Sequence, residues 1–186
     1  MRENIKNSAV ADNLRQLMED TFLNKCNAAL TEDSRLDERE IIEYDGRMRV
    51  GSLEKFNGPC FTVGFNFYSS EENQRRNIPT GTIIYFIEEE CVERLLKSLD
   101  YRGFDEDDQS FVLQHLGEFC QSVSEDYAER LAGLGYGRLL VSPATLSKNN
   151  LPDGMSIPLQ STHYFELSFH LWKKKAVVID LVLAAQ

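Results

Sequence analysis

The sequence has few of the side chains that build metal centres or disulfide frameworks. Its 186 residues include four cysteines, which lie far apart without a Cys-x-x-Cys pair, and three histidines. Each cysteine lies within or beside an apolar stretch, which favours buried free thiols in a reducing cytoplasm over a disulfide or a metal cluster. We therefore expect neither a metal site nor a resident cofactor. The four are Cys26, Cys60, Cys91 and Cys120.

Long apolar runs and positive charge are also scarce. No run approaches the roughly 20 apolar residues of a membrane span, and residues 1–13 lack the basic-then-apolar order of a signal peptide. Asp and Glu number 30 against 20 Lys and Arg, a net charge of −10. Nucleic acids and anionic membranes attract cationic surfaces. We therefore expect a cytoplasmic protein that binds neither, and whose partner presents lysine or arginine.

The usual catalytic motifs are missing as well. There is no Gly-rich phosphate loop, no Gly-x-Ser-x-Gly and no His-Glu-x-x-His. No histidine has a carboxylate or cysteine placed beside it in sequence as a catalytic triad would need, so we interpret all three as surface or partly buried residues. Trp172 lies at core periodicity and is interpreted as packing. The histidines are His115, His163 and His170.

What is present is typical of one globular domain. Hydrophobic residues make up 42% and charged residues 27% of the chain, as in ordinary compact proteins of this length. We expect a single domain over 1–186. In it, residues 1–38 form an N-terminal helix and a charged connector, and residues 39–186 form the main body. The segment TEDSRLDERE (31–40) is interpreted as a linker.

Hydrophobic periodicity predicts an α+β fold. Three- and four-residue steps predict a helix over 9–30, and a short helix is expected over 91–99. Strands are expected over 40–44 and 47–56, joined by an Asp45-Gly46 hairpin turn. Alternation predicts a strand over 60–68 with one buried face, and the run 81–89, apolar on both faces, predicts a central strand. Residues 69–80 read as a polar loop and 137–145 as a strand ended by Pro143. A closing hairpin over 163–172 and 176–184 has its lysine-rich turn at 173–175. Consecutive strands with few helices indicate an antiparallel or mixed sheet with helices packed on one face.

The longest predicted helix covers residues 107–135. Its apolar face carries Val112, Leu116, Phe119, Val123, Tyr127 and Leu131, at the spacing of one buried side. Asp107 and Asp108 suit its N-terminus, and Gly135 suits a left-handed C-cap.

A polar stripe occupies the opposite face of this helix. Gln114, Glu118, Gln121 and Glu125 follow one another at spacings of four, three and four residues, so their side chains are neighbours. A solvated surface is one explanation, since charged stripes are common on exposed helices. A binding or catalytic surface is the other.

The order of segments resembles the CheX/CheC family of chemotaxis phosphatases, and CheX more than CheC, over roughly residues 41–183. The resemblance is carried by Gly81 opening a strand that runs into FIEEECVERLL, and by the Gly117-Glu118 pair. Ser142-Pro143 at a strand end and Ile157-Pro158 before the final hairpin complete it. It implies an α+β fold with two long helices on a sheet.

The resemblance also implies an activity. Such proteins remove the phosphoryl group from the aspartate of a CheY-type response regulator, using a Glu-x-x-Asn motif on the long helix. The Glu pairs with the regulator's lysine, and the Asn positions a water, which fits the dominance of positioning in phosphoryl transfer. Any Mg²⁺ belongs to the regulator, so no cofactor is implied for this chain.

Carried over residue by residue, Glu118 matches the family glutamate and Gln121 stands where the family has asparagine. Glu125-Asp126 stands where a Gly-Asn pair is common. Glu118 and Gln121 are thus the catalytic candidates, and Gln114 and Glu125 are the candidate partner contacts. On the N-terminal helix, Glu19 matches a second family glutamate but Phe22 replaces its asparagine, so that helix is interpreted as structural.

Three hypotheses stay open. The chain is an aspartyl-phosphate phosphatase, or a catalytically silent CheX-like interaction module that binds a receiver domain, or a scaffold with a solvated stripe. Glutamine keeps the carboxamide but adds a methylene, and a misplacement of about 1 Å costs on the order of a hundredfold in rate. Exposed sheet edges also suggest a homodimer.

Overall fold

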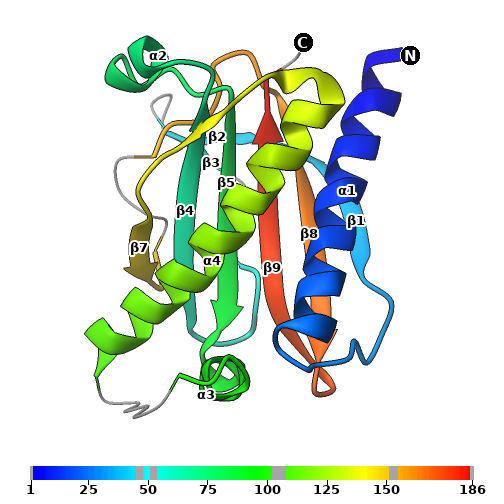
Figure 1. The fold of residues 1–186 in the computed structure, drawn as a ribbon, viewed down its shortest axis with the longest axis vertical. Coiled ribbons are helices and arrows are strands. Elements are labelled where there is room, and N and C mark those ends of the chain that lie inside the picture. Colours follow the sequence, from blue (N-terminus) through cyan, green and yellow to red (C-terminus); the bar gives the residue numbers. More distant parts are fainter. Residues whose placement is uncertain (1, 45–47, 51–53, 102–107, 151–154, 185–186) are drawn as a thin grey trace.

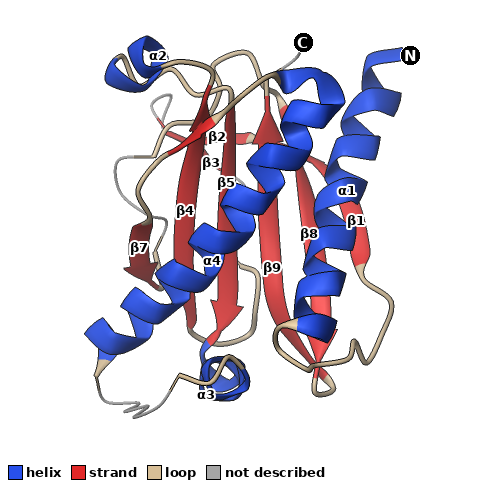
Figure 2. Ribbon diagram, in the orientation of Figure 1, coloured by secondary structure: helices blue, strands red, loops and turns tan. Residues whose placement is uncertain are grey.

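An antiparallel sheet with two long helices on one face makes up the computed structural model, which describes residues 2–44, 48–50, 54–101, 108–150 and 155–184 (Figures 1 and 2). The main strands run in the order β1-β8-β9-β5-β4-β6, and β7 pairs with β4 beside β6. The helices are α1 (Arg2–Asn24), α2 (Glu71–Arg75), α3 (Glu89–Ser98) and α4 (Gln109–Leu131). The strands are β1 (Arg35–Glu40), β2 (Ile42–Tyr44), β3 (Met48–Val50), β4 (Cys60–Tyr68), β5 (Gly81–Glu88), β6 (Leu140–Val141), β7 (Thr145–Lys148), β8 (His163–Leu171) and β9 (Lys174–Leu183). The predicted α+β class is confirmed.

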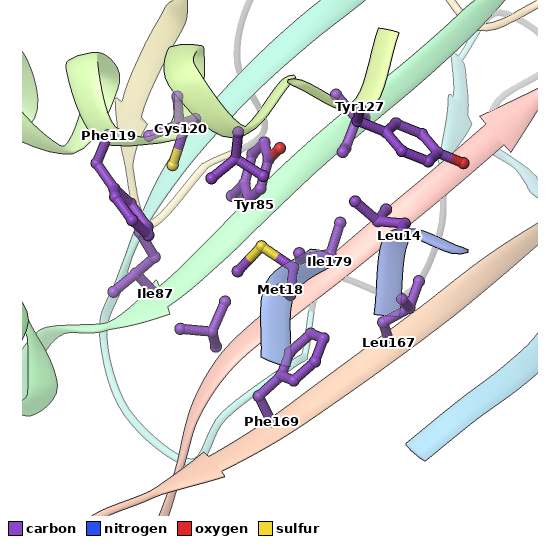
Figure 3. Close-up of a cluster of buried hydrophobic side chains, with 14 of the residues drawn as sticks. Leu14, Met18, Tyr85, Ile87, Phe119, Cys120, Tyr127, Leu167, Phe169 and Ile179 are labelled. Carbon is purple, nitrogen blue, oxygen red and sulfur yellow. The ribbon is translucent and has the colours of Figure 1, made fainter. Parts of the chain in front are cut away.

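The core lies between the two helices and the front of the sheet. Alternate residues of β5, β8 and β9 point toward α1 and α4, so that Tyr85, Phe169 and Ile179 meet Met18 and other apolar side chains of the helices (Figure 3). Phe22 of α1 contacts Phe169 edge to face, with ring centroids 5.4 Å apart. The N-terminal helix therefore shares the main core.

Chain segments also cover the rear of the sheet. β4 was predicted to bury one face, but all its residues except Cys60 are buried. The reason is that Thr62 donates to the Asn150 carbonyl at 2.7 Å and Asn66 donates to the Ser156 carbonyl at 2.7 Å. Such hydrogen bonds let polar residues of the second face be buried. β5 is central, as predicted.

Several predicted boundaries change. The first helix covers 2–24 rather than 9–30. The linker expected over 31–40 is wrong for Arg35–Glu40, because that segment pairs with β8 as an edge strand. Its exposed, charged side chains hide the strand from a periodicity analysis, and charge is typical of protected edges.

Two further segments differ from expectation. The polar loop at 69–80 contains α2, capped by the Ser70 hydroxyl accepting from the Asn73 amide. The strand expected over 137–145 is split around Pro143 into β6 and β7, both paired with β4. The Asp45-Gly46 turn lies outside the described residues, although β2 and β3 on either side of it do pair.

The thiols and the tryptophan have defined places. Cys26, Cys91 and Cys120 are buried and free, and Cys60 is free and half-buried. Trp172 belongs to the β8–β9 turn instead of the core strand, with its ring 5.1 Å from the Arg94 guanidinium. Within the described ranges, no cluster of three metal-ligating side chains occurs. No described helix is long and apolar enough to cross a membrane.

Candidate functional site

Helix α4 positions the predicted site. The Asp108 carboxylate caps it by accepting from the Phe111 amide at 3.0 Å, which satisfies one of the free N–H groups at the helix start. Asp107 lies outside the described residues. A π-helical turn (Ala132–Tyr136) ends the element. Gly135 has the expected positive φ, 102°, but it lies inside this turn, and the C-cap is Gly137 rather than Gly135. The predicted apolar face is confirmed, because all six of its residues are buried.

Three of the four stripe residues line one groove. It lies between α4 and the segment around β7 and has a volume of about 480 Å³. Gln114, Glu118 and Gln121 lie along its helical side, and Ala144 and Leu146 form the opposite wall. Figure 1 shows α4 crossing the sheet diagonally, with β7 beside it at the sheet edge.

Gly117 brings the two walls close. A Cβ at this position would lie 3.2 Å from Leu146 Cδ2, which is tight for a packed carbon. The absence of a side chain therefore sets the width of the groove, and this gives the Gly117-Glu118 pair a physical role.

Glu118 is held by three side chains although half of it is exposed. Gln114 donates to Oε1 at 3.1 Å, and His115 Nδ1 lies 3.0 Å from Oε2. The Tyr101 hydroxyl donates to Oε2 at 3.3 Å. The hydrogen bonds from His115 and then Gln114 lower the pKa of Glu118, so the side chain presents a carboxylate at neutral pH.

Gln121 is half-buried and joined to the fourth stripe residue. Its Nε2 donates to Glu125 Oε1 at 2.7 Å. Glu125 itself lines a second hollow further along α4, beside Arg138 and β6. Its neighbour Asp126 pairs with Lys25, which directly follows α1, at 3.4 Å. Glu125 and Asp126 thus lie on different sides of α4.

His115 and Tyr101 were not predicted to belong to the site. His115 was interpreted as a surface or partly buried residue, and it is partly buried, with 18% of its side chain exposed. Its contact with Glu118, three residues on, could have been inferred from helical spacing. Tyr101 follows α3 in the chain, and no sequence pattern linked it to α4.

Helix α1 shows no comparable arrangement around Glu19 and Phe22. Glu19 bonds to Arg15 and accepts from the Ser34 hydroxyl. Phe22 is fully buried. A buried phenylalanine cannot place a water, so the described part of α1 serves packing here.

No family model and no curated protein matches this sequence. Solved structures do match its fold. A CheC-like superfamily protein from Shewanella sp. PV-4 gives a TM-score of 0.63 at 9% identity, over 95% of this chain and 97% of that one. CheX in a CheX–CheY–BeF3–Mg²⁺ complex from Borrelia burgdorferi gives 0.55 at 14% identity, over 94% of each chain.

A FliM domain has the same fold. The FliM middle domain from H. pylori gives a TM-score of 0.53 at 9% identity, covering 98% of this chain and 92% of that chain. The chain therefore has a CheC-like α+β fold, which CheX and FliM domains share. Because one fold can serve several functions, the choice between them depends on the site.

Proposed function

We propose that this chain is a CheX-like signalling protein that binds a CheY-type receiver domain through α4 and promotes hydrolysis of its aspartyl phosphate. The observation that carries the proposal is the placement of Glu118 and Gln121 together in an accessible groove. The Borrelia burgdorferi CheX, whose fold is similar to that of this chain, forms a complex with CheY. That complex supports the choice of partner.

The roles of the two residues follow from their chemistry. The Glu118 carboxylate pairs with a lysine of the receiver, an interaction its lowered pKa favours. The Gln121 amide holds a water in line with the aspartyl phosphate. Water attacks phosphorus, the bond from phosphorus to the aspartyl oxygen breaks, and aspartate and inorganic phosphate leave. The receiver supplies the metal and the remaining carboxylates, so positioning is this chain's contribution.

Glu125 acts on this arrangement through Gln121. Because it engages Nε2 at 2.7 Å, the amide is oriented with its oxygen left to accept a hydrogen bond from water. The same contact draws the longer glutamine side chain along the helix. Gln114, at the other end of the stripe, is a contact for the receiver, and we propose the same role for Glu125.

A second candidate function is receiver binding without hydrolysis. It is favoured by the same bond between Gln121 and Glu125, since an amide committed to a neighbouring carboxylate is less able to follow a water into the transition state. In that case the groove binds the receiver and leaves its phosphoryl group intact. For either function we propose a cytoplasmic location and a homodimer.

The test is the lifetime of a phosphorylated CheY-type receiver with and without the protein, repeated with Glu118→Ala and Gln121→Ala. We expect wild type to shorten the lifetime and both variants to lose the effect. Gln121→Asn measures how well glutamine replaces asparagine. Binding without a change in lifetime would identify the silent module, and absence of both would contradict both functions.

A further inference from the structure

The Glu118 carboxylate is more firmly held than an exposed glutamate on a helix ordinarily is. Such a side chain rotates freely among several rotamers and orders only when a partner binds. Here its Oε2 lies within hydrogen-bond distance of two groups, Nδ1 of His115 and the Tyr101 hydroxyl, while Gln114 donates to Oε1. The three groups come from α4 and from the loop that follows α3.

We propose that His115 and Tyr101 are positioning residues, which fix Glu118 in the orientation that receives the receiver's lysine. This inference rests on the proposed function, because it assigns a task to groups that touch Glu118 and not the substrate. It adds two residues to the site that the Glu-x-x-Gln pattern does not contain.

The imidazole is itself held from both sides. The centroid of its ring lies 4.2 Å from that of the Tyr101 ring, with an angle of 35° between the ring planes. It also lies 4.2 Å from the centroid of the Phe111 ring, with an interplanar angle of 73°. Such offset and edge-on contacts stabilise one ring orientation. Tyr101 is tied to α3 in turn, because its backbone amide donates to the Leu96 carbonyl at 3.2 Å.

The geometry also dictates a tautomer. An ionised carboxylate only accepts hydrogen bonds, and the lowered pKa keeps Glu118 ionised. Nδ1 of His115 must therefore carry the hydrogen that points at Oε2. When the ring is neutral, Nε2 is then the unprotonated nitrogen.

The consequence for binding is preorganisation. A carboxylate that is already ordered loses little conformational freedom when a lysine approaches, so more of the electrostatic attraction appears as affinity. The groove side of Glu118 stays accessible, with 49% of the side chain exposed. His115 and Tyr101 do not line the groove that Glu118 lines.

The first test uses the protein alone and does not depend on any phosphatase activity. Nitrogen-15 NMR of the imidazole at a pH where the ring is neutral should show Nδ1 protonated in wild type. In Glu118→Ala the fixed tautomer should give way to averaged signals. A protonated Nε2 in wild type, or no change in the variant, would overturn the proposal.

The second test measures receiver binding and dephosphorylation with His115→Leu, His115→Asn and Tyr101→Phe. The asparagine Nδ2 lies the same number of bonds from the backbone as the imidazole Nδ1, so it can donate to Glu118, whereas leucine cannot. We expect leucine to weaken receiver binding about tenfold, as loss of a hydrogen bond to a charged group does. Asparagine should restore most of it, and Tyr101→Phe should give a smaller loss.

Equal behaviour of the leucine and asparagine variants would refute the positioning role, since only the donor separates them. Thermal unfolding of each variant shows whether it is folded. If wild type binds no receiver at all, the proposed function fails, while the NMR result still decides whether His115 clamps Glu118.

Discussion

At the residue scale, the rear of the sheet buries a small cluster of charges. Glu166 of β8 and Asp180 of β9 are directly opposite each other, an arrangement that like charges normally disfavour. Lys55, with 1% of its side chain exposed, places Nζ 2.5 Å from Glu166 Oε2 and 2.8 Å from Asp180 Oδ1. Arg39 of β1 reaches the other Glu166 oxygen at 2.8 Å. The cluster fastens Lys55, which precedes β4, to the rear of the sheet.

Burial dominates the chemistry of Asp180. Loss of hydration raises the pKa of Asp180 to about 7, against the opposing attraction of Lys55. The folded protein thus retains a proton that the unfolded chain releases near pH 4. This contribution to stability is complete below the unfolded pKa and is lost as the pH rises toward 7.

We therefore predict that Asp180→Asn removes part of the pH dependence of unfolding. The free energy of unfolding of wild type, relative to the variant, should fall between pH 5 and 7 by up to about 1.4 kcal/mol per pH unit. Above that range it should level off. Urea titrations at four pH values between 5 and 8 measure it.

Lys55→Met supplies the matched comparison. Without the Lys55 ammonium, Arg39 is the one cation in the described cluster that still opposes the effect of burial, so the pKa of Asp180 should rise further. The free energy of unfolding should then continue to fall above pH 7. A difference between wild type and Asp180→Asn that is constant from pH 5 to 8 would contradict the assignment.

At the element scale, the β8–β9 hairpin turns on two residues that seldom occupy such positions. Trp172 and Lys173 have φ of 54° and 65°, between the paired Leu171 and Lys174. A two-residue turn with both φ values positive prefers Asn-Gly, because a side chain in the left-handed region costs roughly 1–2 kcal/mol. The Trp172 ring packs against the core and lies 5.1 Å from the Arg94 guanidinium, contacts that favour its place in the turn.

We predict that Lys173→Gly stabilises the protein by about 0.5–1 kcal/mol. Lys173 is exposed, so relief of the backbone strain is not offset by lost packing. Lys173→Ala is the control, since it shortens the side chain but keeps Cβ and the strain. Urea unfolding of the three proteins decides, and equal gains for Gly and Ala would rule strain out as the cause.

The same hairpin shows how far element prediction reached. Its two strands follow directly from alternating apolar residues, because each buries one side against the helices. The short strands β1 and β7 do not, because their residues are mostly exposed or half-buried and their pairing partners decide their conformation. Intrinsic β-preference is weak compared with such context.

At the scale of the whole molecule, the first 38 residues are tied to the body that follows. The Tyr127 hydroxyl of α4 donates to the Val10 carbonyl of α1 at 3.0 Å, and β1 pairs with β8 over six residues. These contacts join the N-terminal segment to α4 and to β8. On their basis we propose a single domain over 1–186.

We accordingly predict one cooperative unfolding transition. Circular dichroism, which follows the helices, and the fluorescence of Trp172, the sole tryptophan of the sequence, should give the same urea midpoint. Removing residues 1–30 should abolish cooperative unfolding, because Phe22 and its neighbours on α1 leave the core. Two separate midpoints would show that the N-terminal part folds independently.

Local rules allowed the sequence by itself to determine the α+β class, the buried face of α4 and the polar stripe with Glu118 and Gln121. Periodicity within one element specifies which side is buried, and neighbours on one helix are fixed by its pitch. Only the tertiary structure decided what faces that stripe. The stripe faces Leu146 across the groove and the Tyr101 hydroxyl beside Glu118. The tertiary structure also decided the charge cluster around Lys55 at the rear of the sheet. All of these contacts join residues distant in sequence, so they arise from packing rather than from local spacing.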